Sequence, residues 1–281
     1  MSTIRPLQGN ITLGQAVSYH QTYTPSLLCS LSRSDSRAEL GIENHALPFD
    51  GMDIWTGYEL SWLDMKGKPV VAVAIFMFPC QSMGMVESKS FKLYLNSFNQ
   101  TKFSSLEDVK KTLVMDLSFA VQDSVQVDLF PGNAFSQVSR FMGMFPGECL
   151  DHLPVTVDQY RVDPSLLKLE DNQAQVHEVL FSHVFKTNCP VTGQPDWASI
   201  LIRYSGPRIH RESLLKYLCS FRQQAEFHEQ CVERIFRDLS QHCCCEKLTI
   251  EARFVRRGGL DINPFRTNCG EKPLGLRLLR Q

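Results

Sequence analysis

The stretch KTNCPVTGQPDW, residues 186–197, holds a thiol and a carboxylate seven residues apart, at Cys189 and Asp196. A deprotonated thiol is a nucleophile and a carboxyl group exchanges protons, so the pair has the groups that covalent acid–base catalysis uses. Two prolines and a glycine lie around them, and such residues interrupt both helices and central strands. The sequence therefore predicts a stiff loop that carries the two groups.

Further polar residues gather in two other stretches. VESKSFKLYLNSFN brings Glu87, Lys89 and Lys92 to the start of an expected helix, and FHEQ places His228 beside Glu229. Taken singly, each has a structural explanation, because acidic residues favour helix N-termini and histidines are often hydrogen-bonded surface residues. Cys189 could likewise be a small packed apolar residue.

The stretch RRGGLDINPFR, residues 256–266, has two arginines followed by two glycines. Arginine pairs with phosphate oxygens, and glycine allows a ligand to approach the backbone closely. This pattern is compatible with a phosphate-binding site.

The composition indicates a globular chain of one large or two ordinary domains. It has 281 residues, of which 43% are hydrophobic and 21% charged, with a formal net charge of −1. A near-neutral chain has no general attraction to nucleic acid or to anionic membranes. No apolar signal-peptide run is present at the N-terminus, and VVAVAIFMF, residues 70–78, is too short to span a bilayer, so it predicts a buried strand. We expect a cytoplasmic protein.

Ten cysteines raise the question of a metal site. The densest cluster is HCCC, residues 242–245, whereas structural zinc sites draw paired ligands from separated segments. Four adjacent residues do not easily converge on one ion. The cluster therefore predicts a helix end with small apolar side chains, and we expect no metal.

The chain aligns with itself in three blocks that keep their order. SFKLYLNSF (90–98) matches SLLKYLCSF (213–221), EDVKKTLVMDL (107–117) matches EQCVERIFRDL (229–239), and VQVDLF (125–130) falls opposite LTIEAR (248–253). The offset stays at 122 to 123 residues throughout, which indicates two related modules.

Both modules predict the same order of strand, strand, helix, helix and strand. In the first module we expect a hairpin with its turn at 66–69, helices near 90–98 and 106–121, and a strand at 124–130. In the second module we expect strands at 179–185 and 197–206, helices at 210–223 and 229–242, and a strand at 247–255. Ser104 or Ser105 is the expected N-cap of the longer helix in the first module. In the last strand, Ile250, Ala252 and Phe254 alternate with charged residues, which is typical of a half-buried strand.

This order predicts an α+β fold in which each module is an antiparallel sheet with helices on one face. We place the modules at residues 1–150 and 151–281, with Pro131–Pro154 as the link. The Cys189 loop occurs only in the second module and the paired lysines only in the first. Each module thus carries part of a polar set, which a shared site would unite.

The quoted stretches resemble the NADPH-dependent 7-cyano-7-deazaguanine reductases. VESKSFKLYLNSFNQ, KTNCPVTGQPDW, EFHEQCVERIF and RRGGLDINPFR carry the resemblance, which extends from about Asp53 to Gln281 and matches the long, two-module form of the family. It implies two tandem tunnelling-fold modules and a homodimer. It also implies reduction of the nitrile of the free base, 7-cyano-7-deazaguanine, to a primary amine with two NADPH, on the pathway to the tRNA nucleoside queuosine. The GxGxxG motif is absent, so NADPH would not bind in a Rossmann fold.

The resemblance also implies roles for individual residues. Cys189 would add to the nitrile carbon to form a thioimide, which accepts hydride more readily than a nitrile, and Asp196 would protonate the nitrogen. His228 would assist a later proton transfer. The implied substrate-binding residues are Val86, Glu87, Ser88, His228 and Glu229, and the implied NADPH-binding residues are Ser88, Lys89, Arg257 and Gly258.

Three other functions remain open on the sequence alone. A tunnelling-fold hydrolase would need a set of metal ligands. A non-catalytic purine- or pterin-binding module would bind the base without consuming NADPH. A cysteine amidase acting on the same ring would release ammonia.

Overall fold

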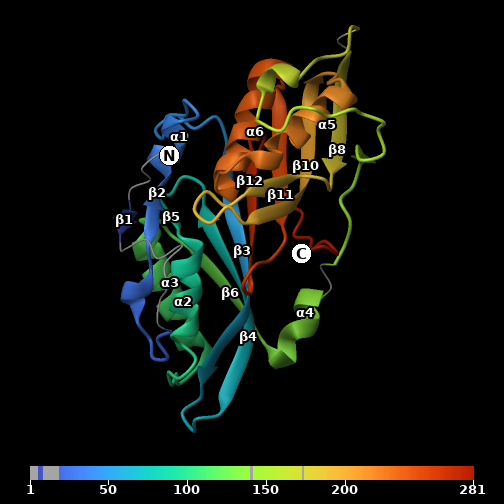
Figure 1. Cartoon of the computed structure of the whole chain (residues 1–281). Helices are drawn as coiled ribbons and strands as arrows, with labels where there is room; N and C mark the ends of the chain where they lie inside the picture. Colours follow the sequence, from blue (N-terminus) through green and yellow to red (C-terminus); the bar gives the residue numbers. More distant parts are fainter. Residues whose placement is uncertain (1–5, 9–18, 140–141, 173) are drawn as a thin grey trace. The chain divides into compact units, whose positions relative to one another are not determined.

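The computed structural model describes residues 6–8, 19–139, 142–172 and 174–281 (Figure 1). The chain divides into two compact units, each built from separate segments. Unit 1 draws on Met1–Leu47, Met52–Phe141 and Arg256–Asp261; unit 2 draws on Pro48–Gly51, Met142–Val255 and Ile262–Gln281. Residues 140 and 141 of the expected link lie outside the described residues. The division at residue 150 stays a prediction.

In the described part of unit 1, the strands pair antiparallel and are accompanied by four α-helices. The strands are β1 (Pro6–Gln8), β2 (Ser30–Ser32), β3 (Asp50–Leu63), β4 (Pro69–Pro79), β5 (Gly84–Val86) and β6 (Gln126–Pro131). The helices are α1 (Arg33–Ala38), α2 (Ser88–Asn96), α3 (Leu106–Val121) and α4 (Phe135–Ser139). One sheet has the order β1-β2-β5, and β4 pairs with both β3 and β6.

The hairpin of β3 and β4 forms where the sequence predicts it. Asp64 accepts hydrogen bonds from the amides of Lys66 and Lys68, both at 2.9 Å, and Gly67 supplies the positive φ of +85° that the turn requires. Burial alternates along β4. The apolar run at 70–78 is therefore buried on one face only, because its other side chains point away from the helices.

Helices α2 and α3 pack on the buried side of unit 1. Ser105 caps α3 by accepting a hydrogen bond from Asp108 N at 3.1 Å, as the sequence predicts. Phe91, on α2, packs its ring edge-to-face with Trp55 and Phe76 at centroid separations of 5.6 and 4.9 Å. This aromatic cluster fixes the start of α2 relative to the sheet.

Unit 2 repeats the arrangement. Its strands are β7 (Glu148–Cys149), β8 (Gln175–Ser182), β9 (Lys186–Asn188), β10 (Pro195–Pro207), β11 (Lys247–Phe254) and β12 (Leu260–Thr267), and its helices are α5 (Arg211–Ser220) and α6 (His228–Cys243) (Figure 1). The strand order is β12-β11-β10-β8-β7, with β9 paired to β10. All pairs are antiparallel except β7 with β8. The expected α+β class is confirmed.

The expected alternation in β11 is wrong, because every residue of this strand after Lys247 is buried. Its charged side chains are matched locally: Arg253 pairs with Glu251, which also accepts a hydrogen bond from Leu274 N at 3.2 Å. On the same unit, the C-terminal residues Leu274, Leu276 and Leu278 pack into a cluster with other apolar side chains. The C-terminal segment thus covers surface that the sequence pattern assigned to solvent.

The internal repeat is also visible in the hydrogen bonds of the two units. Tyr94 donates to Asp116 at 2.6 Å in unit 1, and Tyr217 donates to Asp238 at 2.7 Å in unit 2. A second repeat, PSLL at 25–28 and 164–167, forms a short 3-10 helix in both units and was missed by the sequence comparison because its offset is different.

The HCCC cluster lies at the end of α6, as expected. Cys244 is the exposed C-cap residue with a φ of +51°, while Cys243 and Cys245 are buried. Among the described residues, no group of three or more histidine, cysteine, aspartate or glutamate side chains is placed to hold a metal ion. Within the described part of the chain, no helix is both long and apolar enough to cross a membrane.

Candidate active site

The Cys189 loop is the connection of a tight hairpin in unit 2. Strands β9 and β10 pair Asn188 with Pro195 and Thr187 with Asp196. Cys189 N donates to Gln194 O at 2.8 Å, and Gly193 N donates back to Cys189 O at 3.0 Å. These two hydrogen bonds join the two ends of the loop, as expected for the stiff loop that the sequence predicts.

The thiol and the carboxylate lie on the buried side of this hairpin. Successive side chains of a strand alternate between faces, and burial follows that alternation here. Thr187, Cys189 and Asp196 are buried, whereas Lys186, Asn188 and Trp197 are partly exposed. Cys189 is 4% exposed and Asp196 is 7% exposed. The hairpin therefore turns both candidate groups inward.

His228 and Glu229 lie in the first turn of α6, against the same hairpin. His228 Nε2 is 3.8 Å from Asp196 Oδ2, and the His228 ring packs edge-to-face on Phe254 with centroids 4.0 Å apart. Glu229 is 4% exposed. Unit 2 thus places His228 next to Asp196 and buries the Cys189, Asp196 and Glu229 side chains, and these four are the expected residues that belong to it.

Cys231 follows on the same helix turn and is fully buried. Burial is the main reason that its pKa is raised well above the ordinary value, and the nearby Glu226 adds to the effect. A thiol that stays protonated is a poor nucleophile. Cys231 is therefore not suited to act as a nucleophile at neutral pH.

Val86, Glu87, Ser88 and Lys89 lie in unit 1, at the junction of β5 and α2. The Glu87 side chain, which is 1% exposed, caps α2 by accepting hydrogen bonds from Lys89 N at 2.7 Å and Ser90 N at 2.8 Å. In unit 2 the corresponding cap is His210, which accepts from Ser213 N. Glu87 thus has a structural role, whereas its substrate contact stays a prediction.

Arg257 and Gly258 lie in a two-residue turn of unit 1. Arg257 N donates to Leu260 O at 2.8 Å, and Gly258 and Gly259 have φ values of +58° and +73°, as a tight hairpin of type I′ requires. A Cβ at Gly258 would lie 3.1 Å from Lys92 Nζ. The glycines are thus needed for the turn and for close packing of neighbouring side chains. A shallow pocket opens here, lined by Gly57, Glu59, Lys92, Leu95, Asn96 and Gly258–Leu260.

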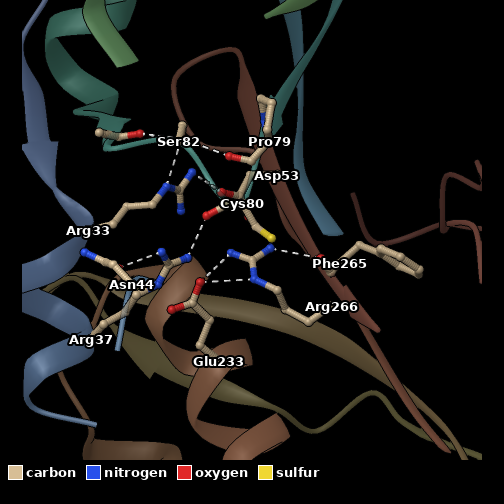
Figure 2. A network of polar contacts seen from close by, with 11 residues as sticks. Arg33, Arg37, Asn44, Asp53, Pro79, Cys80, Ser82, Glu233, Phe265 and Arg266 are labelled. Atoms are coloured by element: carbon tan, nitrogen blue, oxygen red, sulfur yellow. Dashed lines mark hydrogen bonds and ion pairs between the residues drawn. The ribbon is translucent and has the colours of Figure 1, made fainter. Parts of the chain in front are cut away.

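The sequence analysis missed the buried ion pairs that hold the elements in place, which Figure 2 shows. In unit 1, Arg33 on α1 pairs with Asp53 on β3 at 2.6 Å. In unit 2, Arg266 on β12 is fully buried and its guanidinium donates to Glu233 at 2.9 and 3.1 Å. Glu233 is one helical turn after Glu229, so the pair fixes the start of α6 to the sheet. Arg266 therefore serves the fold of its own unit.

Two family models and closely similar proteins match this chain. Residues 19–129 match the family model described as "Nitrile reductase, 7-cyano-7-deazaguanine-reductase N-term", and residues 195–273 match "QueF-like protein". The NADPH-dependent 7-cyano-7-deazaguanine reductase of Saccharophagus degradans is 50% identical over 97% of this chain and 99% of its own length. The chain belongs to this reductase family. The reductase of Chromobacterium violaceum is also 50% identical, over 96% of each chain.

One solved structure, the archaeosine synthase QueF-Like in its apo form, matches with a TM-score of 0.30 and 14% identity over 35% of this chain and 96% of that one. Membership of the reductase family confirms the resemblance drawn from the sequence, together with the oxidoreductase class and the use of NADPH. The roles of single residues stay predictions.

Proposed function

We propose that this chain reduces the nitrile of 7-cyano-7-deazaguanine to the primary amine of 7-aminomethyl-7-deazaguanine, with Cys189 as the nucleophile. The observation that carries the proposal is the placement of Cys189 and Asp196 on the buried side of one closed hairpin, with His228 3.8 Å from Asp196. Simple binding would not require a thiol and an acid on one buried face, and a metal-dependent hydrolase would use metal ligands in place of a thiol nucleophile. A cysteine amidase would use the same two groups, and the test below distinguishes it by its products.

The first step is addition of the Cys189 sulfur to the nitrile carbon. One of the two C–N π bonds breaks, its electron pair goes to nitrogen, and nitrogen takes a proton to give a neutral thioimide. Asp196 is the proton donor, since its carboxyl group is on the same buried face as the thiol. The thiol's own proton can pass through Asp196, so that no external acid is needed. His228, whose Nε2 is 3.8 Å from Asp196 Oδ2, is the proposed proton donor in a later step of the reduction.

Glu229 is the proposed anchor for the base. A guanine-like ring presents adjacent N–H donors on one edge, and a carboxylate accepts two such bonds with good geometry. Glu229 is buried, and a buried carboxylate is stable only when other groups pair with it or donate hydrogen bonds to it. In the complex, the N–H groups of the ring would be such donors. Val86, Glu87, Ser88 and His228 complete the proposed set of substrate contacts.

NADPH supplies the two hydrides that, with two protons, convert the nitrile to the amine. The residues that fit it are in unit 1: Lys89 and Arg257 carry the positive charge that phosphate groups require, and Ser88 adds a hydroxyl donor. Gly258 is exposed at the tip of its turn, next to the Lys92 side chain, and its missing side chain leaves the backbone open on the solvent side.

The test is a stoichiometry measurement on purified protein. NADPH absorbance is followed after adding a limiting amount of 7-cyano-7-deazaguanine, and the product is identified by mass spectrometry. Consumption of two NADPH per nitrile with formation of the amine supports the proposal. Tight binding without NADPH consumption would favour a binding module, and release of ammonia without NADPH consumption would favour an amidase.

The homodimer and the cytoplasmic location, both expected from the sequence analysis, belong to the same proposal. Light scattering of the full chain should give a mass of about twice the 32.0 kDa of one chain. A mass of one chain at enzyme concentrations that support activity would contradict the homodimer.

A further inference from the structure

Lys186 lies on the strand that leads into Cys189, but on the opposite face of the hairpin. It pairs with Trp197 across β9 and β10, and strand alternation places its side chain on the same face as Asn188. That face is partly exposed, whereas the face with Thr187, Cys189 and Asp196 is buried. The Lys186 side chain therefore lies on the face of the catalytic hairpin opposite to Cys189 and Asp196.

The Lys186 ammonium group joins two separate segments. Its Nζ donates to Asn188 Oδ1 at 2.6 Å and to the backbone carbonyl of Arg222 at 2.8 Å. The Arg222 guanidinium in turn stacks over Trp197, 5.5 Å from the ring centroid. One cation thus holds the residue before Cys189 against the short 3-10 helix of residues 221–223.

The backbone continues this link toward α6. Asn188 N donates to Gln224 O at 2.8 Å, and Glu226 N donates to Asn188 O at 3.3 Å. His228 follows only two residues after Glu226, at the start of α6. Any shift of Asn188 relative to residues 222–226 would therefore change the positions of Cys189 and His228 relative to each other.

The charges around Lys186 are mixed. Partial burial and the Arg222 cation lower the pKa of Lys186, while the Asp196 carboxylate raises it. A second guanidinium, that of Arg280, also lies over the Trp197 ring, 5.8 Å from its centroid. The Arg222 guanidinium disfavours a charged lysine here unless hydrogen bonds of the ammonium group compensate for the repulsion. The two short contacts of Nζ are the compensating interaction.

We propose that Lys186 is a positioning residue that braces the Cys189–Asp196 hairpin against the segment leading to His228, and thereby sets the rate of covalent attack on the nitrile. This inference rests on the proposed function. Lys186 touches no reacting atom, so its role is to limit the misplacement of the thiol. Misplacement of a reacting group by about 1 Å can slow a reaction by about a hundredfold.

The test compares Lys186→Met, which keeps the apolar stem, with Lys186→Arg, which keeps the charge and the donors. Lys247→Met, an exposed lysine of the same unit, is the matched control. Three quantities are measured: the rate of adduct formation without NADPH, kcat and KM for the nitrile, and amide hydrogen exchange of residues 186–197.

In the Met variant we expect adduct formation and kcat to fall by about 10- to 100-fold, with KM little changed and exchange of the hairpin faster. The Arg variant should recover most of the rate, and the control should behave as the wild type. A Met variant within about twofold of the wild-type adduct rate would overturn the inference, as would an Arg variant as slow as Met.

These measurements distinguish a failure of the positioning role of Lys186 from a failure of the proposed nitrile reduction. If the wild type forms no adduct with the nitrile, the proposed function fails, but hydrogen exchange still tests the brace. Unchanged exchange of residues 186–197 in the Met variant would then overturn it. Loss of the fold in the Met variant, seen as a thermal transition far below that of Lys186→Arg, would show a general structural role and contradict the specific one.

Discussion

Burial alone does not distinguish Cys189 from the other buried cysteines, so its role depends on the side chains next to it. Six of the ten cysteines are buried, Cys189 among them. Cys243 and Cys245 have pKa values raised to about 12, mainly by burial, so they remain protonated thiols. Cys189 differs in having Asp196 on the same face of its hairpin. The sequence spacing was enough to predict this pair, because a loop of six residues leaves few other arrangements.

Asp196→Asn tests the acid at the residue scale. The amide cannot take the thiol proton and pass it to the nitrile nitrogen, so adduct formation should slow by about 10²- to 10⁴-fold. The rate is measured by quenching and mass spectrometry of the intact protein, without NADPH. An unchanged rate would remove Asp196 as the proton donor.

Glu229→Gln tests the anchor, with Glu107→Gln as its matched control. The two residues align in the internal repeat, but Glu107 is exposed whereas Glu229 is buried. Loss of one acceptor from a buried pair should cost about 1–3 kcal/mol of binding, so the Kd of the base should rise at least about fivefold. The control should bind as the wild type does. Calorimetric titration with the base checks this, and equal affinities of all three proteins would place the anchor elsewhere.

At the scale of elements, the catalytic hairpin depends on one left-handed residue. Gly193 has a φ of +68°, and a Cβ there would meet no atom within 4 Å. Replacement by alanine would therefore cost conformational energy, about 1–2 kcal/mol, without a steric clash. The loop would relax toward a different geometry and move Cys189.

Gly67→Ala is the control for Gly193→Ala, since Gly67 has a φ of +85° and equally open surroundings in the β3–β4 turn of unit 1. Both variants should lose a similar amount of stability, seen in urea unfolding. Only Gly193→Ala should also lower kcat. An equal loss of kcat in the two variants would mean that the geometry of the Cys189 loop does not control the reaction.

For the whole molecule, the sequence predicted most of the elements but not how they are held together. The repeat, the hairpin at 66–69 and the cap at Ser105 follow from local pattern and turn chemistry, and all three are found. The full burial of β11 and the pair of Arg266 with Glu233 depend on segments far apart in the chain. No local pattern contains that information. Lys186 was missed for the same reason, because its partner carbonyl at Arg222 is 36 residues away.

Stability of the whole chain should fall at alkaline pH. Burial, helped by Glu87, raises the pKa of Cys29 to about 11, and burial raises those of Cys243 and Cys245 to about 12. The folded state keeps these protons, whereas the unfolded state loses them near pH 8.5, so the unfolded state binds fewer protons above that pH. The urea midpoint should be constant up to about pH 8 and then fall toward pH 11. A urea midpoint that rises between pH 8 and pH 11 would contradict the raised pKa values of these buried thiols.

The central claim is that Cys189 forms a covalent bond with the nitrile. It is tested most directly by intact-protein mass spectrometry after incubation with 7-cyano-7-deazaguanine in the absence of NADPH, for the wild type and for Cys189→Ala. The account predicts one adduct per chain with the mass of the whole nitrile, mapped to the peptide containing Cys189, and none in the variant. An adduct in Cys189→Ala, or a wild type that consumes NADPH with no adduct at any time, would contradict it.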